Sequence, residues 1–324
     1  MPRAIVVHAV GGPEELRWEE VPDAAPGPGE VRIRHTAIGV NFIDVYFRTG
    51  VYKSPRLPFV LGQEGAGVVE AVGPGVNEVR PGDRVAYAGV QGAYAEVRTL
   101  PAARLVTLPP EIDDRTAAAI MLKGFSAEYL LRRCTRVERG DTILLHAAAG
   151  GVGLLLSQWA AHLGARVIGA VGSPEKARLA AAHGCAHVID YTTEDVAARV
   201  RALTDGVGAD VVFDSVGKAT FAASLDCLRH RGMLVLFGQS SGVVPPFDIG
   251  LLAAKGSLYL TRPSLGHYIA TREELVRSAG ALFEVVRRGA VKVKVGQTYP
   301  LADAAAAHRD LEARKTSGST LLLP

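Results

Sequence analysis

The stretch Thr142-Ile-Leu-Leu-His-Ala-Ala-Ala-Gly-Gly-Val-Gly153 decides the fold of this chain. Its first part, Thr142–His146, is an apolar run that predicts a buried β-strand. Ala148–Gly153 then fits the pattern G-x-G-x-x-G, with alanine in place of the first glycine, and opens a predicted helix over 153–163. In that pattern the glycines let the backbone approach a pyrophosphate and let the helix pack on the sheet, while N–H groups at the helix start bind the anion. A tight turn between strand and helix, without any ligand, is the alternative.

Strands and helices alternate regularly beyond this stretch. Further strands are expected over Arg166–Val171, His187–Asp190, Asp210–Asp214, Met233–Phe237 and Ser257–Thr261. Helices are expected between them over Gly153–Leu163, Pro174–His183, Glu194–Leu203 and Thr220–Arg229. Alternation of this kind predicts an α/β fold with a doubly wound parallel sheet of the Rossmann type.

The tip of the second strand in this series bears on the choice of dinucleotide. An NAD site places Asp or Glu about 20 residues after the glycine loop, where it binds the ribose 2′-hydroxyl. Here the tip reads Val171-Gly-Ser-Pro-Glu-Lys176, with no acid at the strand end itself. Ser173 is a predicted N-cap with Pro174 at the first helical position, and Lys176 can place a cation beside an additional phosphate. The sequence therefore favours NADP over NAD. Glu175 weakens the electrostatic argument, and a solvated helix lysine is the alternative for Lys176.

The N-terminal part of the chain has a different sequence pattern, which predicts short strands separated by turns. Expected strands cover Ala4–His8, Val31–Ala37, Gly65–Val72, Val85–Tyr87 and Ala93–Val97. Many short strands at turn-marked intervals predict a β-rich, barrel-like or sandwich unit. The tail, with a helix expected over Thr271–Gly289 and mixed structure over Val291–Pro324, leaves the alternation and is expected to rejoin this unit.

Composition and charge argue against several classes of protein. The chain has 324 residues and a net charge of +3 without blocks of either sign, so it shows no nucleic-acid footprint. Three cysteines, Cys134, Cys185 and Cys227, lack metal-ligand spacing and indicate a reducing compartment rather than a disulfide framework. No signal peptide is expected at the N-terminus. Polar side chains interrupt the longest apolar stretch, 142–172, so no membrane span is expected either.

A second motif points to a different chemistry. Gly238-Gln-Ser-Ser-Gly242 matches the G-x-S-x-G elbow of α/β-hydrolases, and Asp248 and His267 follow in the chain order of their triad. The elbow needs a helix directly after its serine, and Pro245-Pro246 prevents a helix from starting there. The hydrolase interpretation is therefore the weaker one. The nine histidines show no metal-ligand pairing, so no metal site is expected.

Several segments together resemble the medium-chain dehydrogenase/reductase superfamily. They are Asn41-Phe-Ile-Asp44, Leu61-Gly-Gln-Glu-Gly-Ala-Gly67, Pro81-Gly-Asp-Arg-Val85 and the Ala148–Gly153 loop. Within the superfamily the chain is similar to the zinc-independent quinone oxidoreductases, the NADPH:quinone reductase or zeta-crystallin group, through Leu122-Lys-Gly124, Asp214-Ser-Val-Gly217, Thr261-Arg-Pro-Ser-Leu265 and Gly318-Ser319. Gln63 stands where zinc-dependent relatives have their catalytic histidine, and their cysteine ligands have no counterpart. The resemblance implies a GroES-like catalytic domain over residues 1–123, rejoined by 265–324, and a Rossmann NADP-binding domain over 124–264.

The resemblance also implies roles for individual residues. The cofactor would be NADPH, with Gly150, Gly151 and Val152 at its pyrophosphate. Ser173, Lys176 and Tyr191 would hold the 2′-phosphate with Arg314 assisting, while Ser215, Phe237 and Ser240 would line the cofactor groove. Asn41, Lys123 and Arg262 would approach the nicotinamide, and Tyr46 and Tyr52 would border the quinone. The implied catalytic set is Asn41, Tyr46, Tyr52 and Lys123, although interface aromatics are the alternative for the two tyrosines.

We therefore expect a cytoplasmic NADPH-dependent quinone reductase that works without metal, a homodimer joined through the edge strand Ser257–Thr261. Quinone reduction yields a phenolate-like oxygen of pKa ~10, whereas ketone reduction passes near an alkoxide of pKa ~15.7, a difference worth roughly 8 kcal/mol. Such an acceptor needs positioning and hydrogen bonds rather than a metal ion. An alkenal or enone (enoyl) reductase and a non-catalytic, crystallin-like nucleotide-binding protein remain the alternatives.

Overall fold

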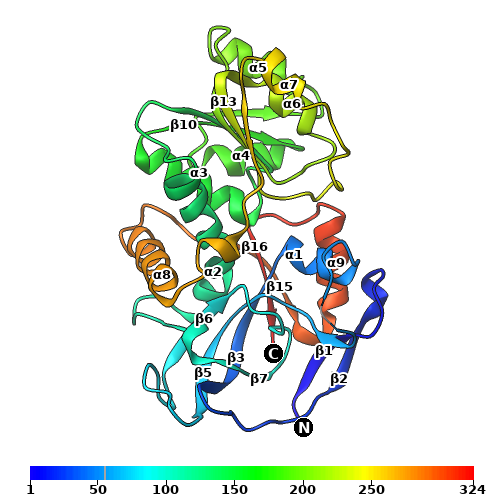
Figure 1. Cartoon of the computed structure of the whole chain (residues 1–324), viewed down its shortest axis with the longest axis vertical. Helices are drawn as coiled ribbons and strands as arrows, with labels where there is room; N and C mark the ends of the chain where they lie inside the picture. Colours follow the sequence, from blue (N-terminus) through cyan, green and yellow to red (C-terminus); the bar gives the residue numbers. More distant parts are fainter. Residues whose placement is uncertain (55) are drawn as a thin grey trace. The chain divides into compact units, whose positions relative to one another are not determined.

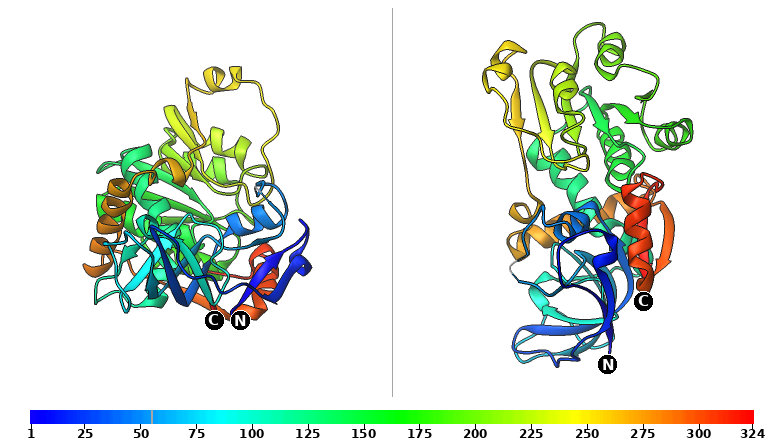
Figure 2. Two further views of the ribbon diagram at one scale, coloured as in Figure 1. Left: turned by 60° about the horizontal axis from the view of Figure 1, so that its bottom comes forward. Right: turned by 90° about the vertical axis from the view of Figure 1, so that its right-hand side faces the viewer.

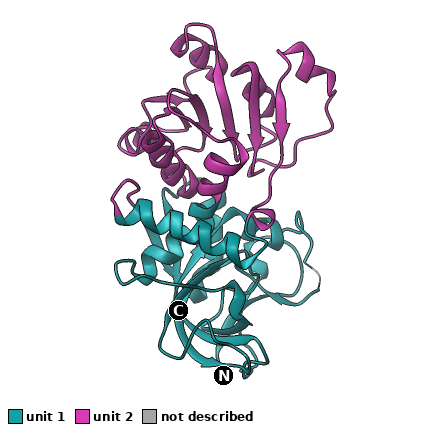
Figure 3. Cartoon of the chain, turned by 60° about the vertical axis from the view of Figure 1, so that its left-hand side comes forward, with its two compact units in different colours: residues 1–125, 269–287, 293–324 teal, residues 126–268, 288–292 magenta. Residues whose placement is uncertain are grey.

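The structure is a computed structural model that describes residues 1–54 and 56–324. It divides into two compact units, coloured separately in Figure 3. The first comprises Met1–Phe125, Ile269–Arg287 and Val293–Pro324, and the second comprises Ser126–Tyr268 and Arg288–Lys292. The chain therefore enters the second unit after Phe125 and returns to the first after Tyr268.

The second unit is built on a six-stranded sheet in which every neighbouring pair of strands is parallel. The strand order is β11-β10-β9-β12-β13-β14, so the chain winds outward from the centre first to one side and then to the other. This order confirms the predicted doubly wound sheet, whose reversal point lies between β9 and β12. The strands are β9 (Thr142–His146), β10 (Arg166–Val171), β11 (His187–Asp190), β12 (Ala209–Asp214), β13 (Leu228–Leu236) and β14 (Tyr259–Thr261).

Helices cover the apolar side chains of this sheet. α3 and α4 pack against β9, β10 and β11, whereas α5 and α6 lie over a buried cluster that includes Leu144, Val212 and Leu234. The helices are α3 (Gly151–Leu163), α4 (Pro174–Ala181), α5 (Val196–Leu203), α6 (Phe221–Asp226) and α7 (Gly250–Ala254). The helix expected over Thr220–Arg229 is wrong at its C-terminal end. It stops at Asp226 because the carbonyl of Cys227 accepts the N–H of Ala209, and β13 begins directly afterwards.

The first unit is β-rich, as predicted, and most of its strand pairs are antiparallel. Its larger sheet has the order β15-β16-β3-β5-β6-β8 with β7 paired to β3, and a smaller sheet has the order β2-β1-β4. The strands from the N-terminal part are β1 (Arg3–Val7), β2 (Leu16–Glu20), β3 (Glu30–Val40), β4 (Phe59–Val60), β5 (Glu64–Val72), β6 (Arg84–Ala88), β7 (Val97–Pro101) and β8 (Val106–Thr107). The strand expected over Ala93–Val97 is wrong. Ala93 and Tyr94 donate their N–H groups to the carbonyls of Gly62 and Leu61, and the regular strand begins only at Val97.

The C-terminal tail completes the larger sheet. β16 (Ser319–Leu323) pairs antiparallel with β3 and parallel with β15 (Val295–Pro300), so the red end of the chain in Figure 1 joins a sheet that begins in blue. The remaining helices are α1 (Phe42–Arg48), α2 (Asp114–Tyr129), α8 (Arg272–Arg287) and α9 (Ala304–Glu312). A π-helical turn, Leu130–Cys134, extends α2.

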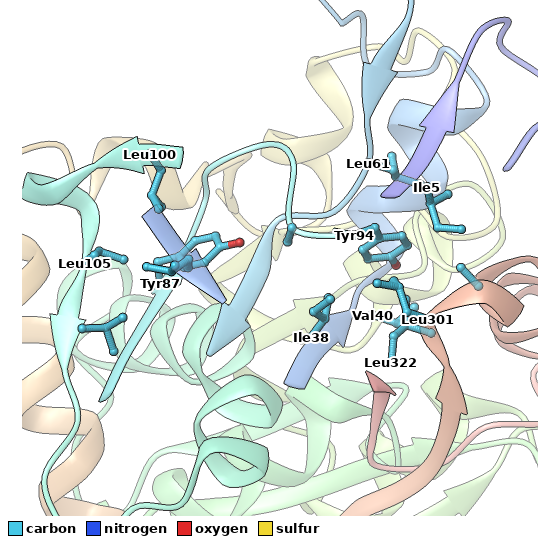
Figure 4. Close-up of a cluster of buried hydrophobic side chains, with 14 of the residues drawn as sticks. Ile5, Ile38, Val40, Leu61, Tyr87, Tyr94, Leu100, Leu105, Leu301 and Leu322 are labelled. Carbon is cyan, nitrogen blue, oxygen red and sulfur yellow. The ribbon is translucent and has the colours of Figure 1, made fainter. Parts of the chain in front are cut away.

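The core of the first unit follows from strand alternation. Along β3 the buried residues Val31 and Ile33 alternate with Arg32 and Arg34, both of which form ion pairs with Glu70. Inward side chains from several strands then meet in one apolar cluster, part of which Figure 4 shows, with Ile5, Ile38, Leu61, Tyr94 and Leu322 among its members. Among the helices of residues 1–54 and 56–324, none is long and apolar enough to cross a membrane.

Candidate functional site

The glycine loop has the geometry that its sequence predicts. β9 ends at His146, Ala147 adopts a left-handed conformation with φ of 53°, and Gly150 caps α3. A Cβ atom on Gly153 would lie 2.4 Å from the carbonyl oxygen of Ala147 and 2.6 Å from that of Ala148, so only glycine fits there. The first N–H groups of a helix have no partner within it and attract anions. The loop and the start of α3 therefore fit a diphosphate.

The tip of β10 brings together three residues assigned to a 2′-phosphate. Ser173 is the N-cap of α4, and its hydroxyl oxygen accepts the backbone N–H of Lys176 at 3.2 Å. Tyr191 follows β11 and reaches back over Gly172, where an added Cβ would lie 2.3 Å from the tyrosine hydroxyl. Glu175 lies exposed in the same helical turn. Arg314 belongs to the first unit and follows α9 with a φ of 59°.

The loops after β12 and β13 are tied to each other. Ser240 donates its N–H to the carbonyl of Ser215 at 3.1 Å, and Phe237 donates its N–H to the carbonyl of Asp214 at 2.9 Å. The structure thus brings together Ser215, Phe237 and Ser240, while Arg262 lies exposed directly after β14. Ser240 is not a nucleophile elbow, because the next helix, α7, begins only at Gly250. This geometry removes the basis of the hydrolase interpretation.

In the first unit a buried carboxylate organises two of the expected catalytic residues. Glu64 is fully buried at the start of β5, and its Oε2 accepts hydrogen bonds from Lys123 Nζ at 2.7 Å and from Asn41 Nδ2 at 2.8 Å. Its Oε1 accepts the N–H of Leu122 at 2.7 Å. Lys123 and Asn41 are only 5% and 6% exposed, so both donors are held in fixed positions. The sequence motif contained Glu64, but nothing in its spacing identified the partners.

A second buried network lies behind Asn41 and was not predicted. Asn41 donates its N–H to Asp44 Oδ2 at 2.8 Å, and the Tyr94 hydroxyl donates to the same oxygen at 3.0 Å. Arg48, which can only donate, bonds His308 Nδ1 at 3.2 Å. Neutral His308 therefore carries its proton on Nε2 and donates it to the Tyr94 hydroxyl at 3.1 Å. The sequence gives no signal for this network because its members are far apart in the chain.

Burial shifts the titration of this network. Desolvation raises the pKa of Asp44 to about 7, against the hydrogen bonds from Asn41 and Tyr94 that lower it. Desolvation, with the charge of Arg48, lowers the pKa of His308 to about 3. Asp44 Oδ1 is buried and has no partner among the residues that the structure describes. Asp44 is therefore a carboxyl with a strongly raised pKa, and it is hydrogen-bonded to Asn41, the N-cap residue of α1.

The two tyrosines expected at the quinone form an aromatic group. Tyr46 on α1 is buried, and its ring lies edge-on to that of Tyr52 with centroids 5.1 Å apart. Phe47 also packs edge-on against Tyr52, at 5.8 Å. Phe42 contacts Tyr46 at the same distance between ring centroids. Tyr46 thus lies in the second half of α1 and Tyr52 in the loop after it, and Asn41 is the N-cap of the same helix.

Gln63 occupies the position where zinc-dependent relatives are expected to have their catalytic histidine. Its amide donates to Gln91, whose own amide donates to the carbonyl of Val60 at 3.1 Å. Within the described ranges, 1–54 and 56–324, no three His, Cys, Asp or Glu side chains gather into a group that could hold a metal ion. The donors at Gln63 are amides, which suit hydrogen bonding better than zinc binding.

Comparison with known proteins agrees with a GroES-like unit followed by a nucleotide-binding unit. Residues 151–279 match the family described as zinc-binding dehydrogenase, and residues 27–110 match the alcohol dehydrogenase GroES-like domain. The chain is 54% identical to a quinone oxidoreductase of Pseudomonas aeruginosa, over 100% of both chains. It is 47% identical to a 2-haloacrylate reductase of a Burkholderia species, over 100% of this chain and 99% of the relative. The solved structure of Escherichia coli quinone oxidoreductase complexed with NADPH superposes with a TM-score of 0.98 at 47% identity, and the match covers 99% of this chain and 100% of that one.

Proposed function

The chain belongs to the quinone oxidoreductases of the medium-chain dehydrogenase/reductase superfamily, and from that premise we propose that it is an enzyme that reduces quinones with NADPH. The observation that carries the cofactor assignment is the tip of β10, where Ser173 caps α4 and Lys176 follows in its first turn without an acid at the strand end. The relative from E. coli is described as a complex with NADPH. When bound, that cofactor supplies the hydride, and the residues of the chain bind and orient the reactants.

The chain's own contribution is binding and hydrogen bonding. The Gly150–Gly153 segment and the start of α3 receive the diphosphate, and Lys176 places a positive charge near the additional phosphate. In the first unit, Glu64 orients Asn41 and Lys123, the donors assigned to the reacting end. Tyr46 and Tyr52 offer an aromatic surface with hydroxyl groups that suits a planar acceptor. A quinone oxygen gains negative charge that its ring delocalises, so a few fixed donors are sufficient.

The same proposal includes independence from metal ions. The side-chain amides of Gln63 and Gln91 bond to each other, and Gln91 also bonds to the backbone. Neither residue provides an imidazole, thiolate or carboxylate, which are the groups that bind zinc in proteins. We expect dialysis against a strong chelator to leave the turnover of NADPH and quinone unchanged. Inactivation that added zinc reverses would show that the metal-free proposal is wrong.

The proposal extends to assembly, location and domain limits. In the part of the chain that the structure describes, β14 is the last strand of the sheet and pairs only with β13 (Figure 2). Tyr259 on β14 is 58% exposed, and Ile249, ten residues earlier in the chain, is 76% exposed. An apolar edge of this kind suits pairing with a second copy of the chain, as in a homodimer. The three cysteines are free thiols, which suits the reducing cytoplasm. We assign residues 1–123 with 265–324 to the catalytic domain and 124–264 to the NADP-binding domain.

A second candidate acceptor is an activated alkene, favoured by the 47% identity to a 2-haloacrylate reductase. An enolate is delocalised like a phenolate, so the same donors would serve both acceptors. The test is NADPH oxidation, followed at 340 nm, with a panel of quinones, enones, haloacrylates and simple ketones. We expect the highest kcat/KM with quinones. The highest value with alkenes would select the second candidate, and binding of NADPH without turnover of any acceptor would favour a non-catalytic protein.

A further inference from the structure

A buried carboxylate in the second unit makes an unusually complete set of hydrogen bonds. Asp214 ends β12 and has no exposed surface. Its Oδ1 accepts the N–H groups of Val216 at 2.7 Å and Gly217 at 3.0 Å. Its Oδ2 accepts the hydroxyls of Thr220 at 2.7 Å and Ser224 at 2.9 Å. Four donors therefore hold one side chain, and two of them belong to the loop that begins with Ser215.

The network continues across the centre of the sheet to β9. Ser224 Oγ lies 3.0 Å from His146 Nε2, and His146 is the last residue of β9 before the glycine loop. Because the Ser224 proton points at Asp214, His146 donates from Nε2 to the Ser224 hydroxyl oxygen. Burial lowers the pKa of His146, against the charge of Asp214, which raises it. A single chain of hydrogen bonds thus joins the carboxyl ends of β9 and β12.

These two strand ends are where the sheet reverses its order. β9 and β12 are neighbours, with Leu145 paired to Phe213, so His146 and Asp214 are next in register. Two loops diverge from this point. One is Ala147–Gly153, which fits a diphosphate. The other starts at Ser215, whose carbonyl oxygen accepts the N–H of Ser240. Ligands of doubly wound sheets bind in the crevice above such a reversal.

We propose that Asp214, with Ser224 and His146, positions the loop from Ser215 to Gly217 relative to the glycine loop and so sets the affinity for the nicotinamide half of the dinucleotide. This inference rests on the proposed function. Asp214 is a positioning residue, because it acts through Ser215 and the N–H groups of Val216 and Gly217.

The composition of the network is that of a hydrolytic triad, but its geometry excludes that role. In a triad the histidine accepts the serine proton, and the carboxylate bonds the other ring nitrogen. Here the Ser224 hydroxyl donates directly to Asp214 and the histidine donates to the serine. All three residues are buried, at 3% exposure or less. The network is suited to holding the backbone in place rather than attacking a substrate.

The experiment compares two probes on three variants. Ser224→Ala removes the bridging hydroxyl, Asp214→Asn weakens the acceptor set, and Thr204→Val is the matched control. Thr204 also has a buried hydroxyl that bonds to backbone: it donates to the carbonyl of Val200 and accepts the N–H of Gly208. Gly208 directly precedes the N-terminal end of β12, whereas Asp214 is at its C-terminal end. The probes are NADPH and adenosine 2′,5′-bisphosphate, which has the 2′-phosphate but lacks the nicotinamide half. Dissociation constants are measured by fluorescence or calorimetric titration at a temperature where every variant is folded.

We expect Ser224→Ala and Asp214→Asn to weaken NADPH about tenfold, the equivalent of one lost hydrogen bond of about 1.4 kcal/mol. Adenosine 2′,5′-bisphosphate should change less than about twofold, and Thr204→Val should change neither probe by more than that. Equal losses for both probes, or NADPH affinities matching the Thr204→Val control, would overturn the inference. If Asp214→Asn fails to fold, Ser224→Ala alone decides. Failure of the unaltered protein to bind NADPH would instead overturn the proposed function.

Discussion

The buried pair of Glu64 and Lys123 gives the sharpest test of the first unit. The charged atoms lie 2.7 Å apart, and the two side chains are 0% and 6% exposed. At that distance the attraction between unit charges is ~6 kcal/mol for an effective dielectric constant of ~20. Most of this attraction offsets the cost of removing both charges from water. The net contribution of the pair is therefore small, although the loss of one partner is expensive.

The perturbation is Lys123→Met, Glu64→Gln and the double variant. Lys123→Met leaves a buried carboxylate with only the neutral donors of Asn41 and Leu122, and we expect it to lower the free energy of unfolding by about 3–5 kcal/mol. The double variant buries no charge at this site and should lose only about 1–2 kcal/mol. The two changes should therefore be strongly non-additive, with the double variant more stable than Lys123→Met.

The assay is urea unfolding followed by circular dichroism at pH 7.5. Arg287→Met is the control, since its partners Glu111 and Glu284 are 58% and 42% exposed and such surface pairs are worth ~0–1 kcal/mol each. Additive losses in the double variant, or a Lys123→Met defect no larger than the control, would refute the reasoning.

Three further outcomes are expected. Lys176→Ala should raise the Kd for NADPH by at least about tenfold, which corresponds to a loss of about 1.4 kcal/mol of binding free energy. The Kd for NADH should stay nearly unchanged, because the lysine charge attracts the 2′-phosphate, which NADH lacks. Equal weakening of both cofactors in a fluorescence titration would show that the lysine does not contact that phosphate. Asp44→Asn should make stability fall more steeply on acidification. The folded-state pKa of Asp44 is about 7 against an ordinary 3.8, so between these values the native wild type binds a proton that the unfolded chain does not. That uptake stabilises the wild type by about 1.4 kcal/mol per pH unit as the pH falls, and the variant lacks it; parallel pH profiles of unfolding free energy would contradict the assignment. Tyr259→Lys should convert a dimer to a monomer in sedimentation velocity runs, because it places a charge on an exposed edge strand; an unchanged sedimentation coefficient would exclude this edge as the contact.

The second unit was largely predictable from the sequence because its information is local. Most of its strands are short apolar runs, and two of its helices begin at side-chain caps, α4 at Ser173 and α5 at Asp195. The glycine loop is likewise a contiguous motif whose steric requirement is met within a few residues, as the close approach of Gly153 to Ala147 shows. The errors were at element ends, where hydrogen bonds from distant segments decide, and in the short helix α7, Gly250–Ala254, which was not predicted.

The site of the first unit was predictable only in part, because its information is not local. Asn41, Glu64 and Lys123 are separated by 23 and 59 positions and meet only through the packing of the larger sheet. The resemblance pointed to Asn41 and Lys123 but gave no role to the carboxylate that joins them. The bond between Tyr94 and His308 spans 214 positions, and neither residue lies in a recognisable motif. Spacing along the chain cannot show such partners.

The place of β16 in the larger sheet has a consequence for biosynthesis. This strand, Ser319–Leu323, is inserted between β15 and β3, so a late segment of the chain completes a sheet that β3 begins much earlier. During synthesis β3 therefore lacks its neighbour β16 until nearly three hundred further residues have been added. The strands β9 to β14 leave the exit tunnel as one uninterrupted segment and can mature during translation. Until β16 is made, the edge of β3 that it later covers is an open strand edge, which is available for incorrect pairing.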